Sequence, residues 1–83
     1  MEPITAIVLI DVKKDGDINE IARELLRIDE ITEVHSVAGI YDVVMKVKVK
    51  EYGSLSDVVT ERVRAIDGIK ETISMPCFKS YKL

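Results

Sequence analysis

The sequence predicts an α+β domain in which an antiparallel four-stranded sheet carries two helices on one face, and three observations lead to this prediction. Four segments are rich in β-branched residues, two segments have apolar residues at helical spacing, and the second half of the chain repeats the first. "IDEITEV" at 28–34 recurs as "IDGIKET" at 66–72, at a constant offset of 38 residues. Each copy reads strand, helix, strand, which gives the βαββαβ order of the split βαβ, or ferredoxin-like, fold. We therefore expect a single two-layer domain over residues 1–83.

The first copy begins with a predicted strand at residues 4–12, "ITAIVLIDV", and the Gly and Asp of "KKDGD" supply a turn after it. We expect Asp17 to be the N-cap of the helix that follows, because Glu20 stands three residues later, as in a capping box. The apolar stripe of this helix comprises Ile18, Ile21, Ala22, Leu25 and Leu26. A second strand is expected over residues 31–39, closing at Gly39.

The second copy begins with a predicted strand at residues 41–49, "YDVVMKVKV". Ser54 is the expected N-cap of the second helix. The apolar stripe of that helix comprises Leu55, Val58, Val59, Val63 and Ile66. The fourth strand is predicted over residues 69–78, directly after Gly68.

Both faces of the sheet are predicted to be apolar near its centre. The first strand has Ile4, Ala6, Val8 and Ile10 on one side and Ile7 and Leu9 on the other, and the third has Val43, Met45 and Val47 opposite Ile40 and Val44. Burying one such side chain stabilises by about 1.5–3 kcal/mol, so a small domain gains from covering its outer sheet face. A second copy of the same sheet is the simplest cover, and we therefore predict a homodimer packed sheet to sheet.

Composition argues against several classes of protein. The net charge of −3 disfavours direct DNA binding, which relies on clustered Lys and Arg. No apolar run approaches the roughly 18–20 residues of a membrane span, and the start does not read as a secretory signal, so we expect a cytoplasmic protein. Because Cys77 is the only cysteine, an internal disulfide and a Cys-rich zinc site are excluded, and no metal or cofactor is expected.

Two stretches carry recognisable motifs: "AGIYDVVMKVKV" has G-x-Y-D followed by an apolar strand, and "IDGIKETIS" has a helix end followed by a strand of the T-x-T type. In this order they resemble the effector-binding domain, or RAM domain, of the Lrp/AsnC family of transcriptional regulators. The resemblance covers essentially the whole chain. It implies a domain that dimerises through its sheets, assembles into rings of dimers such as an octamer or a decamer, and binds an amino-acid effector between dimers.

The resemblance also implies which residues line the effector pocket. Carried over position by position, they are Gly39, Tyr41, Asp42, Thr72 and Ser74. Asp42 is suited to accept hydrogen bonds from an ammonium group, and the hydroxyls of Thr72 and Ser74 can donate to a carboxylate. Two departures stand out: the sequence begins almost directly at its first expected strand, where family regulators usually carry a helix-turn-helix domain, and Ser74 replaces the second Thr of T-x-T. The chain therefore resembles a stand-alone form that could combine with full-length regulators.

Simpler and competing interpretations stay open at this point. Gly39 and Asp42 could serve only the turn between two strands, with Asp42 capping its own loop. The chain could be an assembly module that binds no ligand. An enzyme of the dimeric α+β barrel class would need a base, and His35 is the only obvious one; because no partner group accompanies it, we expect no enzymatic activity.

Overall fold

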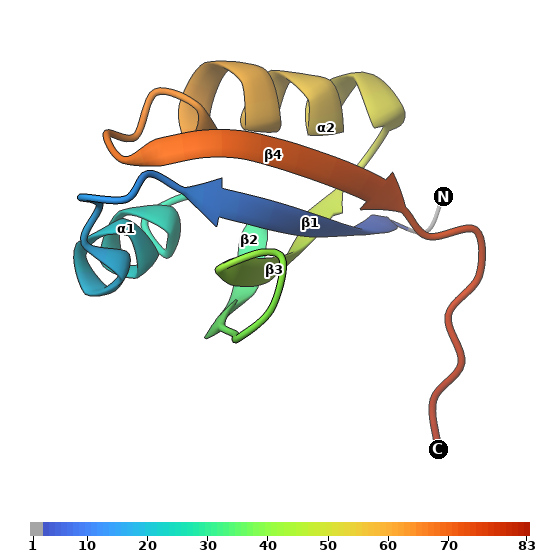
Figure 1. The fold of residues 1–83 in the computed structure, drawn as a ribbon. Helices are drawn as coiled ribbons and strands as arrows, with labels where there is room; N and C mark the ends of the chain where they lie inside the picture. Colours follow the sequence, from blue (N-terminus) through green and yellow to red (C-terminus); the bar gives the residue numbers. More distant parts are fainter. Residues whose placement is uncertain (1–2) are drawn as a thin grey trace.

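The computed structural model describes residues 3–83 and confirms the predicted order of elements. Its strands and helices are β1 (Ile4–Val12), α1 (Ile18–Leu25), β2 (Ile31–Ser36), β3 (Val43–Val49), α2 (Tyr52–Asp57), the π-helix η1 (Val58–Val63) that continues α2, and β4 (Ile69–Pro76). The strands form one antiparallel sheet in the order β2-β3-β1-β4 (Figure 1). This is the ferredoxin-like α+β topology that the repeat predicts.

A single core lies between the sheet and the helices. Alternate residues of β1 and β3 are buried on the helix side, with Val8 opposite Met45 at the centre of the register. The helices add the predicted apolar stripes with one exception, because Leu26 is 57% exposed and does not belong to the core. Ile21, Leu25 and Val63 are almost completely buried. β3 and β1 are the two central strands, each paired on both sides, and β2 and β4 form the edges of the sheet.

Several predicted boundaries are wrong by a few residues. β2 ends at Ser36, before Gly39, and β3 begins at Val43, so Tyr41 and Asp42 precede the strand. β4 ends at Pro76, two residues before the predicted end at residue 78. The loop of residues 37–42 is consequently longer than the predicted turn.

The second helix does not use Ser54 as its N-cap. Glu51, in extended conformation, is the N-cap, and the N–H groups of Ser54 and Leu55 both donate to its carbonyl, at 3.1 and 3.3 Å. Ser54 therefore lies inside the first turn. By contrast Asp17 caps α1 as predicted, accepting a hydrogen bond from the Glu20 N–H at 3.3 Å.

The helix changes character after Asp57 and becomes the π-helix η1. The Arg64 N–H donates to the Val59 carbonyl at 3.0 Å, five residues earlier, and closes this segment. π-Helices are rare and occur preferentially at functional sites. Nothing in the apolar spacing of the sequence predicts this change.

The chain leaves the sheet through one last backbone bond, from the Cys77 N–H to the Thr5 carbonyl at 2.8 Å. Beyond it the C-terminal segment extends away from the sheet (Figure 1), and the side chains of Phe78 and Tyr81 are exposed. Cys77 itself is half-buried. No helix within residues 3–83 has the length and apolar character needed to cross a bilayer.

Candidate functional site

The loop of residues 37–42 carries three of the predicted site residues. Gly39 has φ of +146°, a conformation that L side chains rarely adopt, and the space around its Cα is open. The loop is closed by a hydrogen bond from the Val37 N–H to the Asp42 carbonyl at 2.9 Å. Ile40 is 89% exposed at its tip, and Tyr41 is half-buried. The sequence analysis placed Ile40 on the outer face of the third strand. In the structure Ile40 belongs to this loop.

Asp42 fixes the loop to the end of β1. Its backbone N–H donates to the Ile10 carbonyl at 3.0 Å, and its Oδ2 accepts a hydrogen bond from the Val12 backbone N–H at 2.8 Å. The pairing of β1 with β3 runs only to Ile10 and Val43, so the carboxylate takes the place of the next strand residue. Asp42 thus caps β1 and not its own loop. One bond leaves acceptor capacity, since a carboxylate offers about four lone-pair sites.

Thr72 and Ser74 lie on β4, on the side of the sheet that faces the helices. They pair with Ile10 and Val8, whose side chains enter the core. Both line a hollow of about 330 Å³ between β4 and the second helix. The residues around it are Tyr52, Leu55, Ser56, Val59, Thr60, Arg64, Thr72, Ser74 and Pro76. The Arg64 Nε donates to the Thr72 Oγ1 at 3.3 Å.

The predicted residues therefore form two groups and not one cavity. Ile10 separates them: the Asp42 N–H bonds to Ile10 on one side, and Thr72 pairs with Ile10 on the other. The hollow beside Thr72 is lined by no residue of the loop 37–42. Arg64 belongs to the second group through its hydrogen bond to Thr72, although neither sequence motif includes it.

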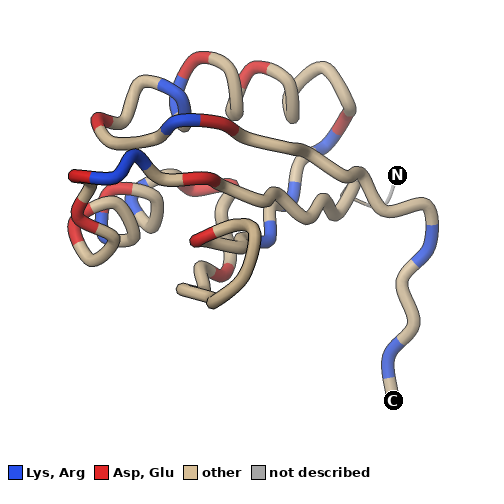
Figure 2. Tube along the Cα trace, viewed as in Figure 1, with Lys and Arg blue, Asp and Glu red and all other residues tan. Residues whose placement is uncertain are grey.

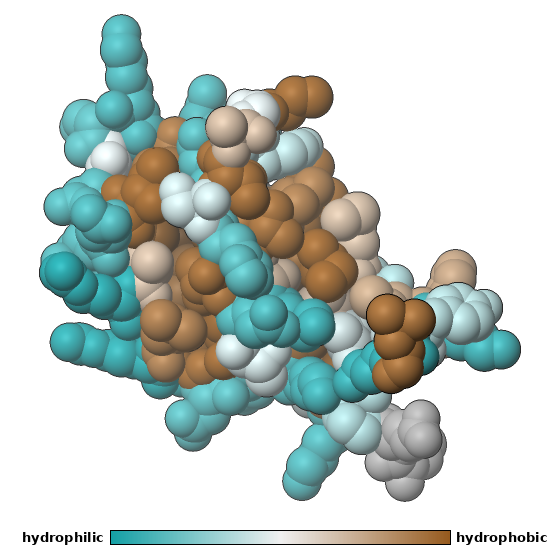
Figure 3. Space-filling view, turned by 90° about the horizontal axis from the view of Figure 1, so that it is seen from below, coloured by the Kyte–Doolittle hydropathy of each residue, from teal (hydrophilic) through white to brown (hydrophobic). Residues whose placement is uncertain are grey.

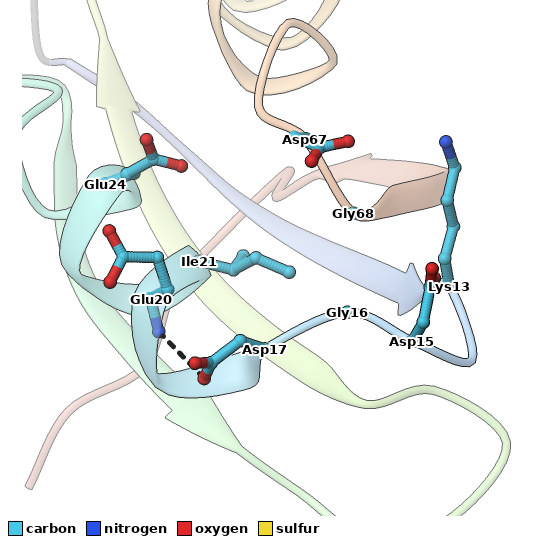
Figure 4. Close-up of a pocket in the computed structure, with 9 residues that line it drawn as sticks. All are labelled: Lys13, Asp15, Gly16, Asp17, Glu20, Ile21, Glu24, Asp67 and Gly68. Atoms are coloured by element: carbon cyan, nitrogen blue, oxygen red, sulfur yellow. Dashed lines mark hydrogen bonds between the residues drawn. The ribbon is translucent and has the colours of Figure 1, made fainter.

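A different hollow, of about 430 Å³, lies where the β1–α1 loop meets the turn before β4 (Figure 4). Its charged lining is mostly acidic and comprises Lys13, Asp15, Asp17, Glu20, Glu24 and Asp67. Figure 2 shows these acidic segments gathered where β1 leads into α1. Asp17 is already engaged as the N-cap, and within residues 3–83 no three His, Cys, Asp or Glu side chains are grouped to hold a metal ion. None of the predicted site residues lines this hollow.

The outer face of the sheet is apolar at its centre. Ile7 and Leu9 of β1 and Val44 of β3 are only half-buried there, and Ile73 and Met75 of β4 are 42% and 43% exposed. Figure 3, seen from below, shows a broad apolar area bordered by hydrophilic side chains. The sequence prediction of two apolar sheet faces is confirmed.

His35 lies at the border of this outer face and is engaged in a surface ion cluster. Its Nε2 is 3.3 Å from Glu33 Oε1, and the Lys46 Nζ is 3.0 Å from Glu33 Oε2. The hydrogen bond from Lys46 and then that from His35 lower the pKa of the Glu33 carboxyl below its ordinary value. The side chain of His35 is 60% exposed. The imidazole therefore lies on an open strand surface, and it is not among the residues that line the hollow beside Thr72.

Comparison with known proteins places the chain among ligand-binding domains. The family described as "Lrp/AsnC ligand binding domain" matches residues 5–83. An HTH-type transcriptional regulator of Pyrococcus furiosus is 34% identical over 80 residues, which is 94% of this chain and 53% of the relative. The chain thus spans about half the length of the curated relatives it matches first.

Solved structures share the fold over nearly all of the chain. The crystal structure of a Thermus thermophilus protein, TTHA0845, has a TM-score of 0.87 and 31% identity, and the match covers 96% of this chain and 99% of that one. A feast or famine regulatory protein from M. tuberculosis, solved with L-methionine, has a TM-score of 0.82 and 24% identity over 96% of this chain and 53% of that one. With its family match over residues 5–83 and its ferredoxin-like sheet, the chain belongs to the Lrp/AsnC ligand binding domain family.

Proposed function

We propose that this chain binds an amino-acid effector and works as an oligomerisation module of Lrp/AsnC regulation in the cytoplasm, without contacting DNA directly. The proposal rests on the exposed apolar outer face of the sheet in a chain that matches a ligand-binding domain family. No element within residues 3–83 covers this face. If two chains associate through this face, effector binding and assembly can be coupled. A ligand that binds one assembly more tightly shifts the population toward that assembly.

The proposed assembly starts from a homodimer in which two outer sheet faces pack together. The exposed fractions of Ile73 and Met75 on β4 leave apolar area to be covered, and the neighbouring Leu9 continues it across the sheet. A two-fold axis lets one patch cover its own copy. Rings of such dimers, an octamer or a decamer, and mixed assemblies with full-length regulators are the further steps that we propose.

The proposed effector site combines the loop of residues 37–42 with the Thr72 and Ser74 strand. Within one chain these groups lie on opposite sides of β1, so a ligand that touches both would need the loop of one chain and the strand of another. An amino acid suits this arrangement, because Asp42 retains acceptor capacity for an ammonium and Thr72 and Ser74 carry hydroxyls. The relative from M. tuberculosis was solved with L-methionine, which supports an amino acid as the ligand class.

The test measures thermal unfolding and assembly mass by light scattering with each of the twenty amino acids. A ligand at about 100 times its Kd stabilises the native state by about 2.7 kcal/mol, so a true effector raises the unfolding temperature in a saturable way. For each chiral amino acid, the D-enantiomer at the same concentration is the control for ionic and osmotic effects. If no amino acid changes the unfolding temperature or the mass, the sensor proposal fails and a ligand-free assembly module takes its place.

A further inference from the structure

The hollow between β4 and the second helix contains one charged residue, Arg64. Its remaining lining divides into an apolar part, with Leu55, Val59 and Pro76, and hydroxyl groups from both the helix and the strand. The acidic hollow near α1 has the opposite character, with five carboxylates and one lysine. An anion with an apolar portion is therefore better matched to the hollow at Arg64 than a cation.

The internal repeat shows that the fold does not need a polar pair at this place. At the offset of 38, Arg64 corresponds to Leu26 and Thr72 to Val34. The structure makes these positions equivalent, since Leu26 and Arg64 are the residues that end the two helices, and Val34 and Thr72 lie on the two strands that follow. The first copy has apolar residues where the second has a hydrogen-bonded arginine and threonine.

The helix geometry holds Arg64 at the hollow. The last turn of η1 is closed by the bond from the Arg64 N–H to the Val59 carbonyl, and Val59 itself lines the hollow. The Thr72 Oγ1 accepts from Arg64 Nε at 3.3 Å, which fixes one of about five donors of the guanidinium and leaves the rest for a ligand. A planar guanidinium with free donors binds a carboxylate through two parallel hydrogen bonds.

The geometry points to Arg64 as the residue that binds the carboxylate of the effector, with Thr72 as its positioning residue and the apolar wall receiving a small aliphatic side chain. This inference rests on the proposed effector-binding function and adds to it a residue and a ligand chemistry. The ligand class is a small aliphatic carboxylate, such as an aliphatic amino acid.

The experiment separates the two ends of such a ligand with two probes. L-Valine without its amine is 3-methylbutanoate, and without its carboxylate it is 2-methylpropylamine. Both are titrated into the full chain while the amide signals of Thr72, Ser74 and Arg64 are followed by NMR. We expect saturable shifts with 3-methylbutanoate and none with the amine. Arg64→Leu, which installs the residue of the first copy, should weaken binding of 3-methylbutanoate roughly 10- to 100-fold.

Arg62→Leu is the matched control, because Arg62 lies on the same η1 segment but pairs with Glu30 at 3.0 Å, outside the hollow. It removes the same charge and should leave the affinity unchanged. Thr72→Val should weaken binding of the carboxylate with an unchanged unfolding temperature, and Thr72→Ser should restore it. A purely structural role of Thr72 would instead lower the unfolding temperature and would not be rescued in affinity.

Each outcome of these titrations either supports or overturns the role of Arg64. Equal affinity of wild type and Arg64→Leu, equal shifts with the amine, or no shift at these amides with 3-methylbutanoate overturns the inference. If an amino acid stabilises the assembly while Arg64→Leu has no effect on it, the inference fails and the proposed function stands. If 3-methylbutanoate binds through Arg64 while no amino acid changes stability or mass, the site stands and the proposed amino-acid sensing fails.

Discussion

The backbone N–H of Val12 donates to Asp42 Oδ2 at 2.8 Å, so one side chain closes the end of a strand thirty positions earlier in the chain. This bond lies just past the last pair of β1 and β3, Ile10 with Val43. The loop of residues 37–42 is thereby attached to the sheet through a carboxylate where a strand residue would otherwise pair. Asp42 has a structural role whether or not it also contacts an effector.

Asp42→Ala should lower the free energy of unfolding by about 1–3 kcal/mol, because the partly buried Val12 N–H loses its acceptor. The chain should still fold, since the core residues are untouched. Urea unfolding measures the change. Asp42→Asn keeps an acceptor oxygen and should recover part of the loss. An unchanged urea midpoint for Asp42→Ala would show that water replaces the carboxylate at no cost.

Gly39→Ala should also be destabilising, by about 1–3 kcal/mol, because the backbone at φ +146° strains any L side chain. No atom lies within 4 Å of the added Cβ, so the effect reports backbone conformation alone. Gly53→Ala is the matched control: that glycine lies in α2 with equally open space, and alanine there should stabilise by about 0.5 kcal/mol. Thermal unfolding of the two variants should therefore shift in opposite directions.

Leu9→Lys should convert the proposed homodimer into a folded monomer, because a charge at the centre of the outer sheet face opposes burial. Sedimentation velocity gives the mass, and circular dichroism checks the fold. The control is Leu26→Lys, which changes an equally large side chain that is 57% exposed at the end of α1. A dimer that survives Leu9→Lys would place the interface elsewhere.

Glu33 provides a pH-dependent term with a defined sign. Lys46 and His35 lower the pKa of its carboxyl from the ordinary 4.5, so the ion cluster stabilises the folded state above that value and the contribution is lost as the pH falls through the folded-state pKa. Glu33→Gln should thus be slightly less stable than wild type near neutral pH, and the difference should disappear as the pH falls below 4.5 and through the lowered pKa of the Glu33 carboxyl. Added salt should reduce the difference, since the cluster is exposed. A difference that persists in acid would exclude the ion pairs as its cause.

Much of the fold follows from the sequence because period and repeat agree. β1 has the predicted bounds, and Asp17 caps α1, since strand alternation and the capping box are local signals. Ser54 illustrates the limit of such signals, because the N-cap is Glu51, three residues earlier in the chain. Tyr52, Gly53 and Ser54 are poor helix formers, and burial of Leu55 stabilises the helix that contains them. The π-helix likewise depends on packing, because Val58, Val59 and Val63 are all buried.

The candidate site is predicted in part for the same reason. The motif locates the loop with Asp42 and the strand with Thr72. The bond from the Val12 N–H to Asp42 joins residues thirty positions apart, and no sequence spacing predicts it. Arg64 was not predicted because it belongs to neither motif. A usable signal was present in the repeat, where Arg64 departs from its counterpart Leu26.

The sheet order also determines when each strand finds its partners during synthesis. β1 is the first strand to be made, yet its outer partner β4 is the last, and Ala6 of the one pairs with Pro76 of the other. Until that strand emerges, one edge of the central strand exposes unpaired N–H and C=O groups beside apolar side chains, which is the situation in which strands aggregate. If translation stops before residue 69, the chain is left with an open sheet edge. We therefore expect cellular quality control to recognise this domain chiefly before β4 has been made.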